Sequence, residues 1–261
     1  MTNQVAPVSG RWLQPSEVDP DVDLRVFLFH YAGGGASIWK GWSELMPDVG
    51  VQTIQYPGRQ ERIGETAYTD MDELVEAIRV ELANEVDDRP YAFLGHCMGS
   101  QVAYRTAVAI ERAGDTGPAL LGLAAWSPVG FRTVSPEQAD MNQEELLGWV
   151  RSLGSLPEDA YADPDLVALL VPVMRADLLA CASYVDDGAM VSCPIVTYSA
   201  KEDPLLPRGA NVAWATRTAD YLGNVEFPGG HFFIHHEELS ITTDFVRLFR
   251  RYASERSVHH G

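Results

Sequence analysis

The sequence predicts an α/β domain in which a mainly parallel central sheet carries helices on both faces and an inserted helical lid. Two observations support this prediction. Short apolar segments alternate with helical segments along most of the chain, and residues 136–190 break the alternation with helical stretches alone. Strands that alternate with helices favour parallel pairing and place ligands beyond the carboxyl ends of the strands. At 261 residues, the chain fits a single domain spanning residues 1–261.

The first half of the chain contains the clearest elements. An apolar strand is expected over residues 24–29, before the glycine-rich HYAGGGAS, and a second strand is expected in VQTIQYPGR. Residues 70–86 place apolar side chains on one helical face after Asp70, which is suited to capping the helix. YAFLG is then expected to form a buried strand, and CMGSQVAYRTAVAIERAG a helix that ends at Gly114.

The second half predicts further strands around the inserted segment. LLGLAAWSPV, CPIVTYSA and NVEFPG are each expected to form a strand. Between the first two of these, PEQADMNQEELLGWVRSLG and DPDLVALLVPVMRADLLACASYV predict two helical stretches, which we interpret as a lid over residues 136–190. Ordinary packing helices are the alternative. The final RSVHHG is expected to be a frayed tail.

Composition and charge argue against several classes of function. The formal net charge of −18 argues against a nucleic-acid partner, because phosphate binding needs clustered cations. The chain does not open with a secretory signal, and no apolar run is expected to span a membrane, so we predict a cytoplasmic protein without a membrane partner. Cys97, Cys181 and Cys193 have neither paired nor metal-ligand spacing, so neither a disulfide nor a metal site is expected.

Cys97 lies at the centre of a G-x-C-x-G motif, Gly95-His96-Cys97-Met98-Gly99, between a predicted strand and a predicted helix. In that context the motif is typical of a nucleophile held on a sharp turn, which needs small residues on both sides. The amino terminus of the following helix favours a thiolate. The alternative is a buried structural cysteine beside glycines that allow close packing.

Two later segments supply candidates for a general base and its acid. His231 follows a double glycine in FPGGHFF, and Asp203 follows the preceding strand in YSAKEDPLLP. The order of nucleophile, acid and histidine is that of a hydrolase triad, in which the acid orients the imidazole. His235 and His236 compete with His231, but neither follows the double glycine. Glu202 competes with Asp203, which we prefer because the adjacent Pro204 marks a loop.

The glycine-rich HYAGGGAS suits an oxyanion hole, which stabilises developing negative charge with backbone N–H groups. We expect Ala32 and Met98 to supply the two donors beside the catalytic candidates Cys97, Asp203 and His231. A phosphate-binding loop is the alternative. The chain contains no G-x-x-x-x-G-K-[ST], and its glycine spacing does not match the dinucleotide fingerprint, so no nucleotide cofactor is expected.

These segments together resemble the type II, stand-alone thioesterases of polyketide and nonribosomal peptide assembly lines, a family with the α/β-hydrolase fold. The resemblance covers nearly the whole chain and rests on HYAGGGAS, YPGRQERIGE, GHCMGS, ADPDLVALLVPVMRADLLACASY, EDPLLP and FPGGHFF. It implies a small-molecule acyl thioester on the phosphopantetheine arm of an acyl or peptidyl carrier protein, which enters beneath the lid. It also implies that the enzyme has neither a metal nor a cofactor of its own.

Cys97 departs from this family, in which the nucleophile is mostly serine. A cysteine that attacks a thioester forms another thioester, so the acyl group stays activated towards water, amines, hydroxyls or carbon. Three interpretations stay open: a cysteine thioesterase, which we favour, a releasing cyclase or acyltransferase of the Dieckmann or lactone-forming kind, and a serine replaced by engineering. A catalytically disabled carrier-binding module is a further hypothesis.

Four apolar residues of the predicted lid are candidates for the wall of the acyl channel: Trp149, Leu170, Met174 and Leu178. Residues at such helical spacing are often core residues instead. For docking, Arg59, Arg62 and Arg208 are expected near the mouth of the site, where they would contact acidic carrier proteins.

Overall fold

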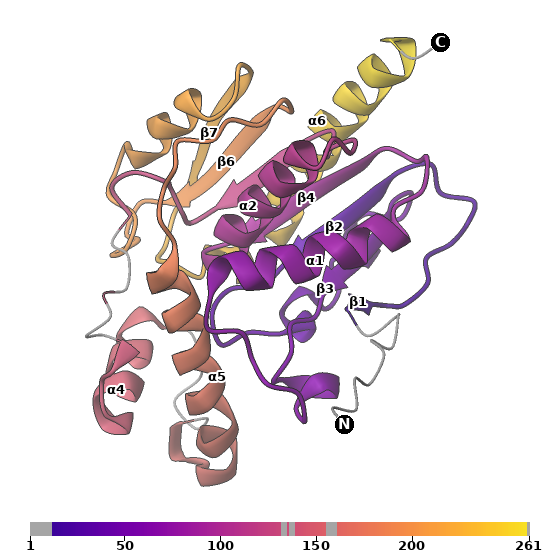
Figure 1. The fold of residues 1–261 in the computed structure, drawn as a ribbon. Helices are drawn as coiled ribbons and strands as arrows, with labels where there is room; N and C mark the ends of the chain where they lie inside the picture. The colour runs from indigo at the N-terminus through magenta and orange to yellow at the C-terminus, as the bar shows by residue number, and fades with distance from the viewer. Residues whose placement is uncertain (1–11, 132–134, 136–138, 155–160, 260–261) are drawn as a thin grey trace.

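A seven-stranded sheet lies at the centre of the described part of the protein (Figure 1). The computed structural model describes residues 12–131, 135, 139–154 and 161–259. In spatial order, the strands are β1 (Leu13–Gln14), β3 (Gly50–Ile54), β2 (Arg25–Phe29), β4 (Tyr91–His96), β5 (Leu121–Ala124), β6 (Ile195–Ala200) and β7 (Tyr221–Phe227). The strands from β3 to β7 pair in parallel and β1 pairs antiparallel with β3, which confirms the predicted mainly parallel sheet.

The central strands are mainly apolar because both faces of the sheet are covered. Every residue of β2 and of β4 is buried. The two strands pair in a register that sets Phe29 opposite Gly95. The segment that follows β2 and the turn that follows β4 therefore leave the sheet side by side at its carboxyl edge.

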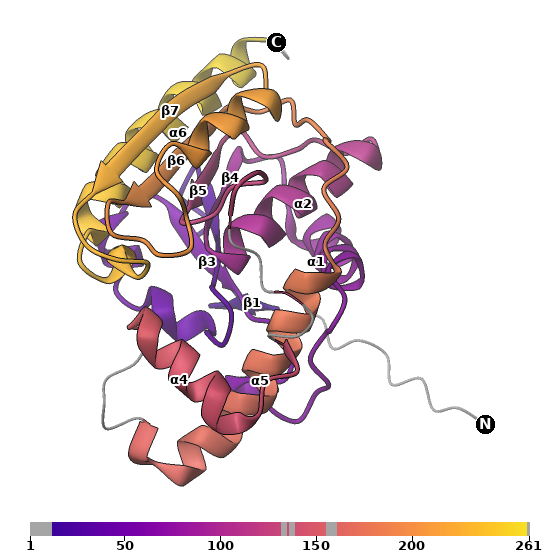
Figure 2. The ribbon, with the colours of Figure 1, turned by 90° about the vertical axis from the view of Figure 1, so that its left-hand side faces the viewer.

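Helices cover both faces of the sheet (Figures 1 and 2). Helices α1 (Met71–Glu85) and α2 (Met98–Arg112) pack on one face, and α6 (Glu238–His259) packs on the other with the short 3-10 helices η1 (Ala36–Trp39) and η2 (Ser43–Leu45). In the described connecting segments lie the 3-10 helices η3 (Gln60–Arg62), η5 (Ala210–Thr216) and η6 (Phe233–His235). Two layers of helices therefore enclose the sheet and bury its apolar side chains.

The sequence predicted α1 and its cap but missed α6. Asp70 accepts a hydrogen bond from the backbone N–H of Glu73, as a capping residue should. Helix α6 includes residues 256–259, so the expectation of a frayed tail was wrong for them. Phe245 and Phe249, one helical turn apart, are fully buried against the sheet. Packing of this apolar face against the sheet stabilises the helix.

Two helices, α4 (Gln143–Leu153) and α5 (Pro164–Ser183), lie between β5 and β6 in the chain and pack together below the sheet (Figure 2). Asn142 caps α4 in a reciprocal arrangement with Glu145. The predicted segment 136–190 falls partly outside the described residues. Its described part contains these two helices and no strand, so the break in the β-α alternation is present at this position.

Helix α5 is long and apolar enough to cross a membrane, judged by length and composition alone. The expectation that no apolar run reaches that length was therefore wrong. In this structure α5 packs beside α1 and α4, and it carries the buried carboxylate of Asp177. Asp177 forms an ion pair with Arg59, so this helix is tied to the rest of the protein through a charged group.

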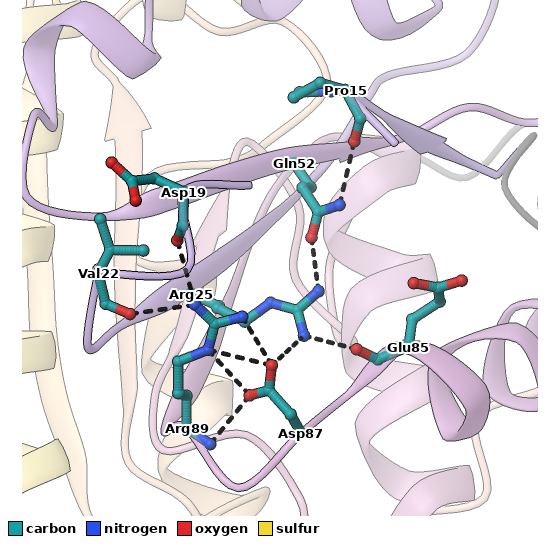
Figure 3. Close-up of polar contacts among 8 residues, drawn as sticks. All are labelled: Pro15, Asp19, Val22, Arg25, Gln52, Glu85, Asp87 and Arg89. Carbon is teal, nitrogen blue, oxygen red and sulfur yellow. Dashed lines mark hydrogen bonds and ion pairs between the residues drawn. The ribbon is translucent and has the colours of Figure 1, made fainter. Parts of the chain in front are cut away.

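Arg25 is buried at the amino-terminal end of β2, where it joins the strands to the end of α1 (Figure 3). Its Nη2 donates to Oε1 of Gln52 on β3 (2.6 Å), and its Nη1 donates to the backbone oxygen of Glu85 (2.5 Å) and to Oδ2 of Asp87 (3.3 Å). Gln52 donates in turn to the backbone oxygen of Pro15 (3.0 Å). These bonds offset the cost of burying a charge and stabilise the end of the sheet opposite the turn that follows β4.

Candidate active site

Cys97 lies on the sharp turn between β4 and α2. Its φ of 54° and ψ of −117° fall outside the regions that residues with a side chain ordinarily adopt, which stores roughly 1–3 kcal/mol of strain. The flanking glycines are required by close packing. A Cβ at Gly95 would lie 2.4 Å from the carbonyl of Gly99, and a Cβ at Gly99 would lie 2.0 Å from the backbone oxygen of Phe29. The spacing of the motif therefore follows from the contacts of the turn.

His231 lies between Cys97 and Asp203. Its Nδ1 is 2.8 Å from Oδ2 of Asp203, and it also forms a side-chain hydrogen bond with Cys97, which leaves Nε2 for the sulfur. Oδ1 of Asp203 accepts hydrogen bonds from the backbone N–H groups of Leu205 (2.8 Å) and Leu206 (3.3 Å), so its orientation is held from both sides. The three predicted catalytic candidates therefore meet at the carboxyl edge of the sheet.

The rival residues have other partners. Glu202 accepts a hydrogen bond from the backbone N–H of Gly229 (2.5 Å), so it holds the double-glycine turn rather than His231. Nε2 of His235 lies 3.0 Å from the hydroxyl of Tyr31. His236 is exposed. The geometry therefore favours His231 and Asp203 over the competing histidines and carboxylate.

Opposing influences set the pKa of His231. Burial acts to lower the pKa of the imidazole, but the charge on Cys97 and the hydrogen bonds to Asp203 and Cys97 together outweigh burial and raise the pKa from 6.5 to about 10. The raised pKa therefore favours the protonated imidazole of His231 near neutral pH.

This raised pKa predicts how stability depends on pH. His231 binds its proton more tightly in the folded protein, so its contribution to the free energy of unfolding is complete below pH 6.5 and is lost as the pH rises through about 10. Thermal unfolding of the wild type should therefore show a decline in stability over this range. We expect His231→Gln to reduce the decline and the exposed control His236→Gln to retain it. Equal declines in all three proteins would contradict the assigned shift.

Ala32 and Met98, the predicted oxyanion donors, both border the cavity that contains Cys97. Met98 is the first residue of α2, so its N–H has no acceptor within the helix. Among the described residues, neither backbone N–H has a hydrogen-bond acceptor. Gly33, next to Ala32, has a φ of +75° and donates its N–H to Oδ2 of Asp177 (2.7 Å), which holds the loop in place.

The cavity beside Cys97 has a mainly apolar wall. Trp149, Met174 and Leu178 line it, as expected for three of the four predicted channel residues. Leu170 does not, and instead lines a neighbouring pocket beside Gly33. Leu170 and Leu178 are eight residues apart on α5. At 3.6 residues per turn, this separation is about 80° more than two full turns, so the two side chains face different directions. The sequence pattern had missed other wall residues, which come from distant loops: Trp126, Phe131 and Leu205.

Two of the three predicted docking arginines are buried. Arg59 is 5% exposed and donates from Nη1 and Nη2 to the carboxylate of Asp177 (2.6 and 2.8 Å). Arg62 is 6% exposed, donates to Glu65 and stacks on an aromatic ring. Both support the loops around the site, so the docking prediction was wrong for them. Arg208 is exposed and pairs with Glu226. One sequence feature indicates that a cation is buried here: Asp177 lies within an apolar helix, where a carboxylate needs a partner.

The cysteines differ in their surroundings. All three are free thiols; Cys193 is buried in the core, whereas Cys181 lines the same cavity as Cys97. Burial and the nearby charge of Cys97 raise the pKa of Cys181 well above its ordinary value, so Cys181 is a poor rival nucleophile. Within the described ranges, no group of three or more His, Cys, Asp and Glu side chains could hold a metal ion.

Comparisons with known proteins identify the family. The thioesterase-domain family model matches residues 24–249. The chain is 29% identical over 243 residues to the gramicidin S biosynthesis protein GrsT of Aneurinibacillus migulanus, covering 92% of this chain and 94% of that protein. It is also 29% identical over 241 residues to Thioesterase PikA5 of Streptomyces venezuelae, covering 90% and 84%.

Solved structures agree with this match. The type II thioesterase BorB from the borrelidin biosynthetic cluster has a TM-score of 0.81 at 28% identity and covers 91% of this chain and 97% of that chain. RedJ, a thioesterase from the prodiginine biosynthetic pathway in Streptomyces coelicolor, has a TM-score of 0.76 at 30% identity and covers 90% and 86%. This chain therefore belongs to the thioesterase-domain family, has the α/β-hydrolase fold of its relatives, and is a thioester hydrolase.

Proposed function

We propose that this thioesterase acts on acyl groups held as phosphopantetheine thioesters on the carrier proteins of a polyketide or nonribosomal peptide pathway, with Cys97 as the nucleophile. The observation that carries the proposal is the hydrogen-bonded series from Cys97 through His231 to Asp203 at the mouth of an apolar cavity. Relatives named for gramicidin S and borrelidin biosynthesis support the pathway class. We place this activity in the cytoplasm, with an acyl or peptidyl carrier protein as partner.

The first half of the reaction transfers the acyl group to the enzyme. His231 holds the proton of Cys97, and the thiolate attacks the carbonyl carbon of the thioester. The carbonyl oxygen takes up negative charge between the N–H groups of Ala32 and Met98. The bond between the carbonyl carbon and the pantetheine sulfur then breaks, and the leaving thiolate takes the proton from His231. The products of this half are acyl-Cys97 and a free pantetheine thiol.

The second half depends on a change in the pKa of His231. Acylation removes the charge on Cys97, which is the strongest of the influences that raise the pKa of His231. The pKa therefore falls, and the neutral imidazole, oriented by Asp203, accepts a proton from water as the water attacks the acyl-cysteine. The bond between the carbonyl carbon and the sulfur of Cys97 then breaks and the free acid leaves, so the Cys97 thiolate and the protonated His231 form the starting ion pair again.

Helices α4 and α5 act as the lid in this proposal. Trp149 of α4 and the pair Met174 and Leu178 of α5 border the cavity that contains Cys97. An acyl chain bound there would contact these three side chains and Trp126. In the proposed lid over residues 136–190, the described helices α4 and α5 would thus shield the acyl chain from solvent.

The test is intact-mass spectrometry after incubation with acyl-pantetheine thioesters. The wild type should gain the mass of the acyl group on Cys97 and then lose it as the free acid appears. Cys97→Ala should gain no mass and release no acid, whereas Cys193→Ala, which changes a cysteine away from the cavity, should behave as the wild type. Acid release by Cys97→Ala would refute the nucleophile. An adduct that survives in water but yields a cyclised or amine-coupled product would replace hydrolysis by cyclisation or transfer.

A further inference from the structure

Gln101 is the unusual polar residue of the cavity wall. It lies on α2, four residues after Cys97, is 2% exposed, and borders the same cavity. Residues four apart on a helix lie on the same face, so its side chain is on the side of the nucleophile. Its Nε2 is fully buried and has no hydrogen-bond partner among the described residues. An amide is therefore available beside an otherwise mainly apolar acyl site.

Other buried glutamines in this protein are paired. Gln52 donates to the backbone oxygen of Pro15 and accepts from Arg25. Gln55 accepts from the backbone N–H of Ala36 and donates to the backbone oxygen of Tyr56. A buried amide without a partner is destabilising, so its presence in a native protein calls for a structural or functional explanation. Gln101 borders the proposed acyl cavity, where an oxygen atom of a bound substrate can supply the missing partner.

We propose that Gln101 determines specificity by forming a hydrogen bond with an oxygen atom on the acyl chain, so that the preferred substrates are hydroxyacyl or ketoacyl thioesters rather than fully reduced chains. The amide suits both groups, because its N–H donates to a keto oxygen and its two ends can pair with a hydroxyl. Gln101 follows Cys97 by four residues, which corresponds to a rise of about 6 Å along a helix. The acyl-chain oxygen that Gln101 binds is therefore expected a few carbon atoms from the thioester carbonyl. This inference rests on the proposed function.

The test compares thioesters that differ by one oxygen. Hexanoyl-, 3-hydroxyhexanoyl-, 3-oxohexanoyl- and 5-hydroxyhexanoyl-pantetheine are hydrolysed by the wild type and by Gln101→Met, and kcat/KM is measured for each. The wild type should prefer at least one oxygenated chain over hexanoyl by roughly tenfold, the scale of one buried hydrogen bond. Gln101→Met, which has a similar shape and no amide, should lose that preference and gain activity on hexanoyl-pantetheine.

Two variants separate recognition from shape. Leu178→Met changes an apolar wall residue and should alter the rates of all four substrates by a similar factor, which keeps the preference. Gln101→Asn retains the amide on a shorter side chain and should retain part of the preference. Two outcomes would overturn the role of Gln101 and leave the proposed function intact. They are a preference that persists in Gln101→Met and equal wild-type rates on all four substrates. Failure of the wild type to hydrolyse any of them would refute the proposed function as well.

Discussion

Replacement of His231 by alanine should lower kcat for thioester hydrolysis by about a thousandfold, the scale of general acid–base catalysis. In the proposed mechanism His231 takes the proton of Cys97, gives it to the leaving pantetheine thiolate and then activates water. Its removal therefore affects every step. Its buried position 2.8 Å from Asp203 gives the imidazole a single orientation that no neighbouring side chain can supply. Steady-state kinetics with an acyl-pantetheine thioester measures the effect.

The matched control for this experiment is His236→Ala. His236 lies five residues further along the chain and is exposed, so its loss should change kcat by less than twofold or so. Circular dichroism of both variants tests whether they fold. A loss below tenfold in His231→Ala would remove His231 from the mechanism, and an equal loss in both variants would indicate damage to the loop rather than to catalysis.

Replacement of Asp177 by leucine should lower the free energy of unfolding by about 3–5 kcal/mol, the cost of leaving one partner of a buried ion pair without the other. The substitution leaves the guanidinium of Arg59 buried and unpaired. It also removes the acceptor of the backbone N–H of Gly33, next to the proposed oxyanion donor Ala32. Urea unfolding measures the loss, and a fall in kcat should accompany it.

A second substitution tests the cause. The double variant Arg59→Met with Asp177→Leu removes both charges and should recover much of the stability lost in Asp177→Leu, because no unpaired charge remains. Glu76→Ala, which breaks an exposed pair with Arg79 on α1, should cost less than about 1 kcal/mol. An Asp177→Leu variant as stable as Glu76→Ala would contradict the importance of the buried pair.

Much of the fold could be predicted because it depends on local pattern. Alternating apolar segments and the capping residue Asp70 located β2, β4, α1 and α2 to within a few residues. Strand β1 has two residues, which is too short for any periodicity to show. Helix α6 was not predicted, although Phe245 and Phe249 are four residues apart, a spacing that places both on one face of a helix.

The candidate site could be predicted in part for a similar reason. Cys97 follows a strand and is flanked by glycines, and His231 follows two glycines, so local sequence marks both as residues on exceptional turns. The choice between Asp203 and Glu202 rested on one proline, whereas the structure shows which carboxylate the imidazole contacts. Exposure could not be predicted for Arg59, because it depends on a helix far along the chain.

By itself, the sequence determined which segments form most strands and helices and which residues carry reactive groups, because periodicity and glycine placement act over a few neighbouring positions. Only the tertiary structure decided how the buried polar groups pair. Arg59 and Asp177 are 118 positions apart, yet they share two hydrogen bonds, whereas Nε2 of Gln101 has no hydrogen-bond partner among the described residues. The physical reason is that a buried polar group must find its partner among whatever segments pack around it, and that packing is set by contacts across the whole chain.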